Sequence, residues 1–245
     1  NRLRLRKLAA TEAITGLDWP SNGEGTTRFS FLGSDVPTIQ PLTLLWKINP
    51  TQQTGYYTTF FHADINGSVE ELQNSPYFGC HPYPNPPPSG TAHNWEVSIE
   101  TLDDIVDENA NNTTVNKGQW FQQACVATED PAGELRVKFY WDIATNLNRL
   151  IDHTITFQTN YLSLDAPLTP AVVFGDAPWN ANAELMSGIF RGLIIVQSAL
   201  STTHIQALSA LETNSAVISY CASNSITLWY LNMNPTPSDI TDKSG

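Results

Sequence analysis

The chain has 245 residues, of which 41% are hydrophobic and only 15% are charged, and its formal net charge is −12. An average soluble protein carries about 25% charged residues, so this composition excludes a coiled coil, an acidic disordered tail and a basic nucleic-acid-binding domain. No apolar run approaches the roughly 20 residues that a membrane-spanning helix needs, and nucleic acid is not expected as a partner because an acidic body repels phosphates.

Residues 1–26 open with a basic segment in which charged and apolar residues alternate. As a strand, this segment places its arginines on one face and its leucines on the other. Three interpretations of this segment are open. It is an edge strand whose charges deter aggregation, or an arm that docks on the acidic body of a neighbouring copy, or a flanking segment without a role. In the second interpretation the assembly residues are Arg2, Arg4, Arg6 and Lys7.

Ten short runs after residue 26 are rich in β-branched and aromatic residues and are bounded by Gly, Pro, Asn or Asp, which is typical of strands. They are Thr27–Leu32, Leu42–Ile48, Tyr56–His62, Trp95–Leu102, Trp120–Ala127, Leu135–Trp141, Leu150–Gln158, Ala171–Gly175, Ile189–Val196 and Ile226–Leu231. Two stretches between them are predicted to be loops. Asn74–Gly90 contains six prolines, which a sheet interior does not accept, and Asp103–Gly118 is polar and acidic.

One helix is predicted, near residues 201–212, with Ser201 as its N-cap. Ile205, Leu208 and Leu211 recur at a spacing that gives this helix one apolar stripe. Many strands and one helix predict an all-β fold, a two-sheet antiparallel β-sandwich. Residues 27–245 are expected to form this single domain, including a C-terminal strand or tail at 213–245.

The spacing of the three cysteines matches no zinc site. Cys125 lies in an apolar strand run and is predicted to be a buried, inert thiol, which leaves Cys80 and Cys221 as the disulfide pair. The chain does not begin with methionine and has no apolar leader, so we expect a cleaved leader and an extracellular or surface location. Asn66 and Asn112 lie in glycosylation sequons and are interpreted first as surface loops, then as glycan sites.

Four blocks of the sequence, over roughly residues 27–212, carry a resemblance to a known family. They are Leu42–Pro50, Lys117–Val126, Leu135–Asp142, and Phe174–Asp176 with Ser187–Ile195, Ala199–Ser201 and Ile205. Together they resemble the laminin-G-like, concanavalin A-like jelly roll, and the last block is the most specific. The resemblance implies a jelly-roll sandwich.

The end of the chain departs from that family. In similar modules an Asp-x-Ser-Gly segment normally opens the domain, whereas here Asp242-Lys243-Ser244-Gly245 closes the chain. Three hypotheses explain this order. The chain is a piece of a longer one, its last strand completes the sheet in an unusual order, or that strand completes the sheet of a neighbour by strand addition. The third hypothesis predicts a homo-oligomer or polymer built through the terminal strands.

Alternation places Glu96, Ser98 and Glu100 on one face of a strand. This pattern is similar to the Glu-x-Asp-x-Glu strand of retaining glucanases that share the sandwich, which use one carboxylate as nucleophile and one as acid/base. The central aspartate is replaced by Ser98, which cannot tune a nucleophile as a carboxyl group does. The alternatives are a polysaccharide-cleaving enzyme that uses Glu96 and Glu100, and a solvent-facing strand.

Calcium is the one cofactor that the sequence suggests, because Ca²⁺ prefers six to eight oxygen ligands. The candidate ligands, in a segment without EF-hand spacing, are Asp103, Asp104, Asp107 and Glu108. A solvated acidic loop is the alternative. Asp239 and Asp242 form a second candidate, since in similar modules this turn often lies near a bound calcium.

Aromatic side chains on loops can stack on sugar faces, and Tyr77, Tyr83 and Trp179 are the candidates for carbohydrate binding. Subunit contacts and local packing are the alternatives for these rings. The five histidines show no metal-ligand or nucleophile spacing and are predicted to be structural. The sequence thus favours an extracellular, non-catalytic module that binds a glycan or copies of itself, with the glucanase-like enzyme as the alternative.

Overall fold

The computed structural model describes fifteen strands, two helices and several of the segments that join them. The described residues are 6–7, 11–13, 16–19, 29–32, 41–50, 58–62, 77–84, 93–100, 105–109, 118–129, 135–145, 150–155, 170–174, 188–235, 239 and 241–245. Side chains are described within 41–49, 118–128, 136–145, 152, 189–235, 239 and 241–245.

All ten predicted strands are present, with ends that differ by a few residues from the prediction. The first nine strands are β1 (Arg6–Lys7), β2 (Thr11–Ala13), β3 (Gly16–Trp19), β4 (Phe29–Leu32), β5 (Leu42–Pro50), β6 (Thr58–His62), β7 (Tyr77–Pro84), β8 (His93–Glu100) and β9 (Ile105–Asn109). The other strands are β10 (Phe121–Glu129), β11 (Leu135–Tyr140), β12 (Leu150–Ile155), β13 (Pro170–Phe174), β14 (Gly188–Val196) and β15 (Leu228–Asn232). The helices are α1 (Thr202–Ser209) and α2 (Asn214–Ser223).

The largest sheet has eight antiparallel strands in the order β12-β11-β10-β5-β14-β3-β2, and β15 also pairs with β14. One edge of β14 pairs with β5, while its other edge is divided between β3 and β15. The family-like sequence blocks form β5, β10, β11 and β14, which are neighbours in this sheet. The resemblance therefore rests on strands that form one continuous surface.

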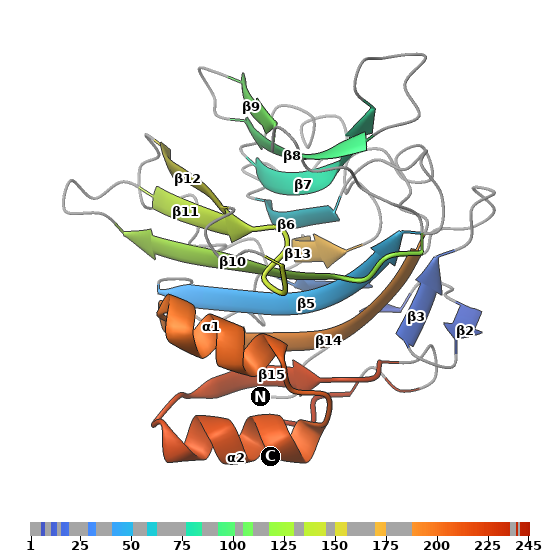
Figure 1. The fold of residues 1–245 in the computed structure, drawn as a ribbon, viewed down its shortest axis with the longest axis vertical. Helices are drawn as coiled ribbons and strands as arrows, with labels where there is room; N and C mark the ends of the chain where they lie inside the picture. The colour runs from blue at the N-terminus through green and yellow to red at the C-terminus, as the bar shows by residue number, and fades with distance from the viewer. Residues whose placement is uncertain are drawn as a thin grey trace.

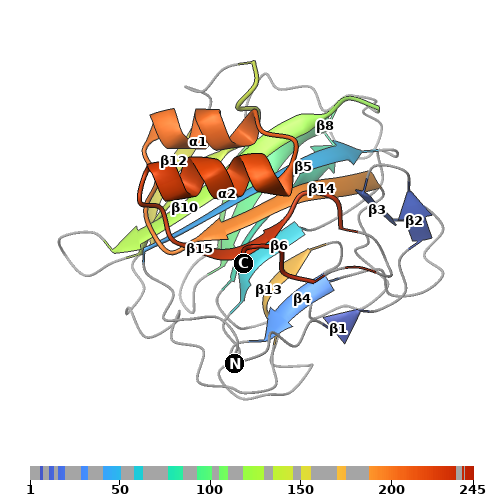
Figure 2. The same cartoon turned by 90° about the horizontal axis from the view of Figure 1, so that it is seen from below.

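Strand β13 and the sheet β6-β7-β8-β9 lie on one side of the large sheet (Figure 1), and β4 and β1 follow β13 in the three-stranded sheet (Figure 2). Strand β13 runs beside β6, so the two sheets together form the second layer. The helices α1 and α2 lie next to each other on the opposite side of the large sheet (Figure 2). The fold is a two-sheet antiparallel β-sandwich with helices on one outer face, as the predicted fold class requires.

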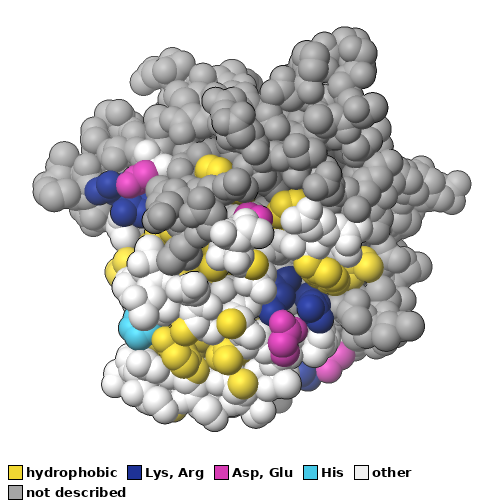
Figure 3. All heavy atoms as spheres, in the orientation of Figure 1, with side chains coloured by type: hydrophobic (Ala, Val, Ile, Leu, Met, Phe, Trp, Pro, Cys, Tyr) yellow, Lys and Arg dark blue, Asp and Glu magenta, His cyan; other side chains and the backbone are white. Residues whose placement is uncertain are grey.

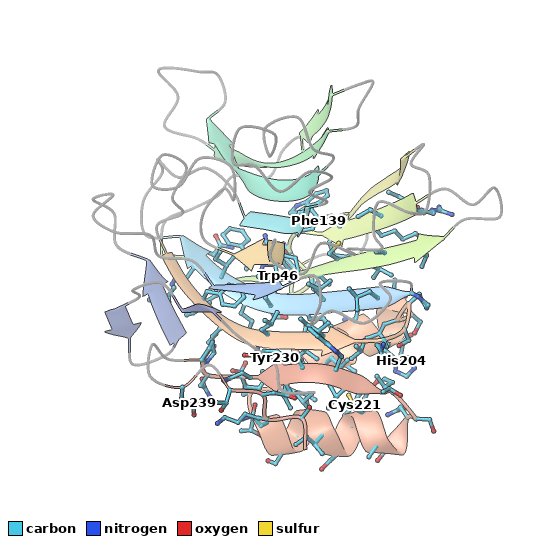
Figure 4. All side chains as sticks on the ribbon, turned by 180° about the vertical axis from the view of Figure 1, so that it is seen from behind. Trp46, Phe139, His204, Cys221, Tyr230 and Asp239 are labelled. Atoms are coloured by element: carbon cyan, nitrogen blue, oxygen red, sulfur yellow. The ribbon has the colours of Figure 1, made fainter. Side chains whose placement is uncertain are left out.

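Strand β5 is buried on both of its faces, because one face meets the helices and the other meets the second layer. Leu45 belongs to a core cluster with residues of α1 and α2. Successive side chains of a strand alternate between faces, so Trp46 lies on the other side, where it stacks on Phe139 with 6.2 Å between ring centroids. Its indole N–H donates to Gln123 Oε1 at 2.8 Å, in the space between the sheets (Figure 4).

The first helix begins at the predicted N-cap, where Ser201 Oγ accepts the His204 N–H. The second helix is absent from the sequence-based expectations. It is rich in serine and β-branched residues, which are weaker helix formers than alanine or leucine. Only Val217 and Cys221 are buried along it, so its apolar stripe is narrow. Its N-cap Thr213 accepts the Ala216 N–H, and packing on the sheet supplies the remaining stability.

Strand β7 corrects the expectation that Asn74–Gly90 is a loop. It lies between β6 and β8, but β6 pairs only with Tyr77–Cys80, while Pro82 and Pro84 pair with β8 alone. Proline has no N–H to donate and is accepted where a strand has only one partner. Strand β9 likewise corrects the predicted loop at Asp103–Gly118, since Ile105–Asn109 pairs with β8.

Strand β15 pairs with β14 of the same chain, so within this chain it completes the large sheet. Its outer edge is covered by residues 239 and 241–245, which we call the C-terminal clasp. The Leu231 N–H donates to Asp242 Oδ1 at 3.0 Å, and the Leu231 carbonyl accepts the Lys243 N–H at 2.7 Å. Asn232 Nδ2 donates to the backbone carbonyls of Asp239 and Thr241.

The carboxylates of the clasp are engaged by protein donors. Asp239 accepts from Lys243 Nζ and from the Thr241 hydroxyl, and Asp242 accepts from the backbone and hydroxyl of Ser244. Within the described residues no three His, Cys, Asp or Glu side chains come together as a metal site. Through these contacts the acidic residues of the clasp fix the turn that covers β15, and the calcium hypothesis for Asp239 and Asp242 stays a prediction.

The clasp is expected to loosen in acid. Its Lys243 and Thr241 donors lower the pKa of Asp239 from 3.8 to about 2. A carboxylate whose pKa is lowered on folding stabilises the fold above its unfolded pKa and loses that contribution as pH falls to the folded value, here between pH 3.8 and about 2. Hydrogen exchange of the Lys243 amide, corrected for its intrinsic rate, should therefore accelerate over this range. The same acid response in Asp239→Asn would contradict this origin.

The predicted Cys80–Cys221 disulfide is not formed, because Cys221 is a free, buried thiol. Cys80 lies on β7 in the second layer, whereas Cys221 lies in α2 on the far side of the large sheet. A disulfide needs Cα atoms within about 7 Å, and layers of a sandwich are about 10 Å apart. Cys125 is also buried and free, as predicted, and burial raises the pKa of both described thiols.

Candidate functional site

The two glutamates of the glucanase-like pattern lie on β8, an interior strand of the four-stranded sheet. Glu96 is opposite His81 of β7 and Asn109 of β9, and Glu100 is opposite Tyr77 and Ile105. Their carboxyl groups lie outside the described side chains. The catalytic hypothesis therefore stays a prediction.

The predicted aromatic site is spread over the fold. Tyr77 and Tyr83 lie at opposite ends of β7, and six residues of strand span about 20 Å, so these two positions do not form one stacking platform. Trp179 lies outside the described residues. The same holds for the sequon residues Asn66 and Asn112.

The predicted charged sites are described only in part. Arg2, Arg4, Asp103 and Asp104 lie outside the described residues. Asp107 and Glu108 lie in strand β9. Arg6 and Lys7 form β1, which pairs with β4 at the edge of the three-stranded sheet; the role of their charges stays a prediction.

The structure brings together a different set of polar residues on the helix-bearing face of the large sheet, beyond the end of α1. Figure 3 shows basic and acidic side chains touching there, with hydrophobic side chains beside them. We call this set the polar patch, and its members are Lys47, Asn49, Trp120, Arg191 and Glu212. Lys47 is opposite Arg191 in the pairing of β5 with β14, and Trp120 directly precedes β10, whose first residue is opposite Ile48.

A buried lysine forms the base of the polar patch. The Lys47 side chain is only 5% exposed, and its Nζ donates to Glu212 Oε1 at 2.5 Å and to the Leu211 carbonyl at 3.0 Å. Both acceptors lie in the connection between α1 and α2, where carbonyl groups at the end of α1 favour a nearby cation. The Glu212 side chain is 55% exposed, so this ion pair joins the sheet interior to the protein surface.

Arg191 and Trp120 form the outer part of the polar patch. The Arg191 guanidinium carbon lies 4.5 Å from the centroid of the Trp120 ring, a cation–π arrangement, and its Nη2 is 3.4 Å from Glu212 Oε2. The pairing of β14 with β5 has a bulge after Arg191, and Gly192 has φ +69°. Bulges re-aim side chains and are frequent beside functional sites, and this one directly follows Arg191.

Asn49 closes the polar patch on the side of β10. Its Nδ2 donates to the Gly118 carbonyl at 3.3 Å, which ties β5 to the residues that precede Trp120. Its Oδ1 is buried and has no hydrogen-bond partner among the described residues, and the same is true of Arg191 Nε. The polar patch therefore combines an unpaired acceptor and an unpaired donor with an aromatic ring and an exposed carboxylate.

The sequence contained one usable signal for this patch. In Leu42–Ile48 a lysine occupies position 47 of a run that is otherwise almost wholly apolar, and a charged residue in such a strand needs a partner. The partner, Glu212, is far away in sequence, and nothing in the residues around Trp120 or Arg191 marks either of them as part of a site. Only the strand order brings them together.

This arrangement is suited to binding polar, ring-shaped ligands. An indole and a guanidinium plane offer stacking surfaces, and the carboxylate and guanidinium offer hydrogen bonds of both polarities. The Glu212 carboxylate contacts two cations, Lys47 and Arg191. A carboxylate held in this way is suited to accept hydrogen bonds from a ligand rather than to act as a nucleophile or a proton donor.

Comparison with solved structures finds 52 matching chains, and two of them are described by name. Domain 4 of AbnA, a GH43 extracellular arabinanase from Geobacillus stearothermophilus solved in complex with arabinotriose, is 18% identical, with a TM-score of 0.52 over 83% of this chain and 82% of that domain. Tailspike protein 2 of the Escherichia coli O157:H7 bacteriophage CAB120 is 13% identical, with a TM-score of 0.53 over 86% of this chain.

The chain spans 28% of the tailspike protein and most of the arabinanase domain. Identities this low show the fold alone, a β-sandwich that the chain shares with these proteins. Neither a scan against family models nor a search of curated proteins finds a match for the chain. Neither described helix is long and apolar enough to cross a membrane.

Proposed function

We propose that this chain is a non-catalytic glycan-binding module of an extracellular or surface protein, and that the polar patch is its binding surface. The observation that carries the proposal is the partly exposed Trp120 ring, held against the Arg191 guanidinium beside the exposed Glu212 carboxylate. An aromatic ring covers the apolar C–H face of a sugar, while neighbouring charged groups hydrogen-bond its hydroxyls.

Two further points support the proposal. A domain with the same fold, from the arabinanase, was solved with arabinotriose bound. The strongly acidic chain, with a net charge of −12, disfavours an anionic polysaccharide, so the ligand class is a neutral oligosaccharide. We further propose that the module belongs to the laminin-G-like group of sandwiches, on the strength of the sequence blocks that form β5, β10, β11 and β14.

Self-assembly through the terminal strands has less support. In the described part of the chain, Arg6–Lys7 and β15 each pair with a strand of their own chain, and the clasp covers the outer edge of β15 at Leu231. The glucanase-like alternative depends on Glu96 and Glu100 and makes a different prediction, the release of reducing ends from β-glucans. It predicts the loss of that activity in Glu100→Gln.

The glycan-binding proposal is tested by a neutral-glycan array and by isothermal titration calorimetry with arabinotriose. Binding should weaken about tenfold or more in Trp120→Ala, because the variant loses the apolar surface that covers a sugar ring. Neutral ligands also predict an affinity that changes little between low and high salt, whereas an anionic ligand would be sensitive to salt.

Trp229→Ala serves as the matched control, since Trp229 is a partly exposed tryptophan on β15 outside the polar patch. Thermal unfolding of each variant separates a binding defect from a folding defect. The proposal fails when the folded wild-type chain binds no glycan on the array. It also fails when Trp120→Ala and Trp229→Ala bind equally well.

A further inference from the structure

The polar patch contains an acceptor and a donor that have no hydrogen-bond partner among the described residues. Asn49 is 9% exposed, and its Oδ1 has no partner among the described residues. Arg191 Nε is likewise buried and unpaired, although the rest of its guanidinium contacts Trp120 and Glu212. A buried polar atom without a hydrogen bond is costly, so two of them in one patch need an explanation.

Both residues lie on neighbouring strands of the large sheet. Asn49 of β5 is opposite Ile189 of β14, two positions before Arg191, so the two residues are diagonal neighbours, roughly 7–8 Å apart at the backbone. The Asn49 amide is fixed by its bond from Nδ2 to the Gly118 carbonyl, which leaves Oδ1 as the free end. The register shift in the pairing of β14 with β5 begins directly after Arg191, where Gly192 has φ +69°.

We infer that these two atoms recognise neighbouring hydroxyl groups of the bound saccharide, and this inference rests on the proposed glycan-binding function. One hydroxyl donates to Asn49 Oδ1, and an adjacent one accepts from Arg191 Nε. A sugar hydroxyl can do either, because it carries one donor and two acceptor lone pairs. The pair therefore makes Asn49 and Arg191 specificity-determining residues for a free vicinal diol.

Both atoms are closed to solvent in this structure, so the ligand reaches them when the Arg191 side chain turns. This movement is small in cost, since the ion pair with Glu212 is long at 3.4 Å and a partly exposed cation–π contact is weak. The hydroxyl groups then pair with a donor and an acceptor that no described residue satisfies. Binding is thereby coupled to a movement of Arg191 relative to Trp120.

The test measures arabinotriose affinity by calorimetry for three substitutions at these positions. Asn49→Leu removes the acceptor and should weaken binding about tenfold. Asn49→Asp keeps an oxygen acceptor but loses the donor to Gly118, so it should bind within about threefold of wild type. Arg191→Lys keeps the positive charge, lacks Nε, and should also weaken binding about tenfold. Fully O-methylated arabinotriose, which has no hydroxyl to donate, should bind poorly to the wild-type chain.

Ser198→Ala is the matched control, because Ser198 Oγ is also buried and unpaired but lies outside the polar patch, and its affinity should equal that of wild type. The inference is overturned when Asn49→Leu and Arg191→Lys bind like wild type, or when Asn49→Asp is as weak as Asn49→Leu. If either of these results is found but Trp120→Ala still loses binding, the inference about Asn49 and Arg191 is wrong while the proposed glycan-binding function stands. If Asn49→Leu does not fold, Arg191→Lys decides. Absence of any glycan binding by the wild-type chain overturns both.

Discussion

Trp46→Ala is expected to lower the free energy of unfolding by about 4 kcal/mol, the range for removing a large aromatic side chain from a core. Trp46 is 1% exposed and lies between the two sheets. Its removal deletes the stacking on Phe139 and leaves a cavity that β5, held on both edges by β10 and β14, cannot collapse to fill. Urea denaturation followed by circular dichroism measures the effect.

Trp46→Phe separates the ring from its hydrogen bond. This variant keeps an aromatic ring against Phe139 but leaves Gln123 Oε1 without the indole donor, so we expect a loss of about 2 kcal/mol. Ile218→Ala, at the exposed helix position, should change stability by less than about 0.5 kcal/mol. A Trp46→Ala effect as small as that of Ile218→Ala would mean that the sheets do not pack as described.

Glu212→Gln is expected to destabilise the protein by about 3 kcal/mol, although Glu212 is a surface residue. Lys47, its partner, is 5% exposed, and removing the carboxylate leaves the buried ammonium group without a compensating charge. The reverse change, Lys47→Met, leaves only an exposed glutamate, which water solvates, and should cost less than about 1.5 kcal/mol. The exposed partner of this pair is therefore the more sensitive one.

The exposed ion pair of β11 and β12 provides the control. Asp152 accepts from Arg136 at 2.6 Å and lies 3.5 Å from Lys138, and the bond from Arg136 lowers the pKa of Asp152. Asp152→Asn makes the same carboxylate-to-amide change, but between exposed side chains, so it should cost less than about 1 kcal/mol. Equal effects of Glu212→Gln and Asp152→Asn, or a double variant Lys47→Met/Glu212→Gln no more stable than Glu212→Gln, would contradict this account.

Strand positions were predictable because the relevant signal is local. Runs such as Leu42–Ile48 and Ile189–Val196 are β-branched or aromatic and end at turn residues, whatever they pack against. The proline-containing strand β7 could not be predicted, since whether Pro82 is acceptable depends on how far β6 extends alongside it. Helix α2 is a similar case, because its stability comes from the sheet beneath Val217 and Cys221 rather than from its own sequence.

The candidate site was less predictable than the fold. The sequence-based candidates, such as the glutamates of β8 and the tyrosines of β7, were identified because each group lies close together along the chain. The polar patch has no such pattern, because Lys47, Trp120, Arg191 and Glu212 come from four separate segments. Their proximity follows from the order β10-β5-β14 and from the helical connection placed over it, which requires knowledge of the tertiary arrangement.

The divided edge of β14 also bears on how quickly the chain reaches its native state. Residues 16–19 and 228–232 both dock on this one strand, so segments separated by most of the polypeptide must find the same template. Closing such a large loop costs conformational entropy before the contacts that stabilise it have formed. Chains with many contacts between residues distant in sequence therefore fold slowly. During synthesis on the ribosome, β3 and its neighbour β2 therefore cannot join the large sheet until residues 188–190 have emerged.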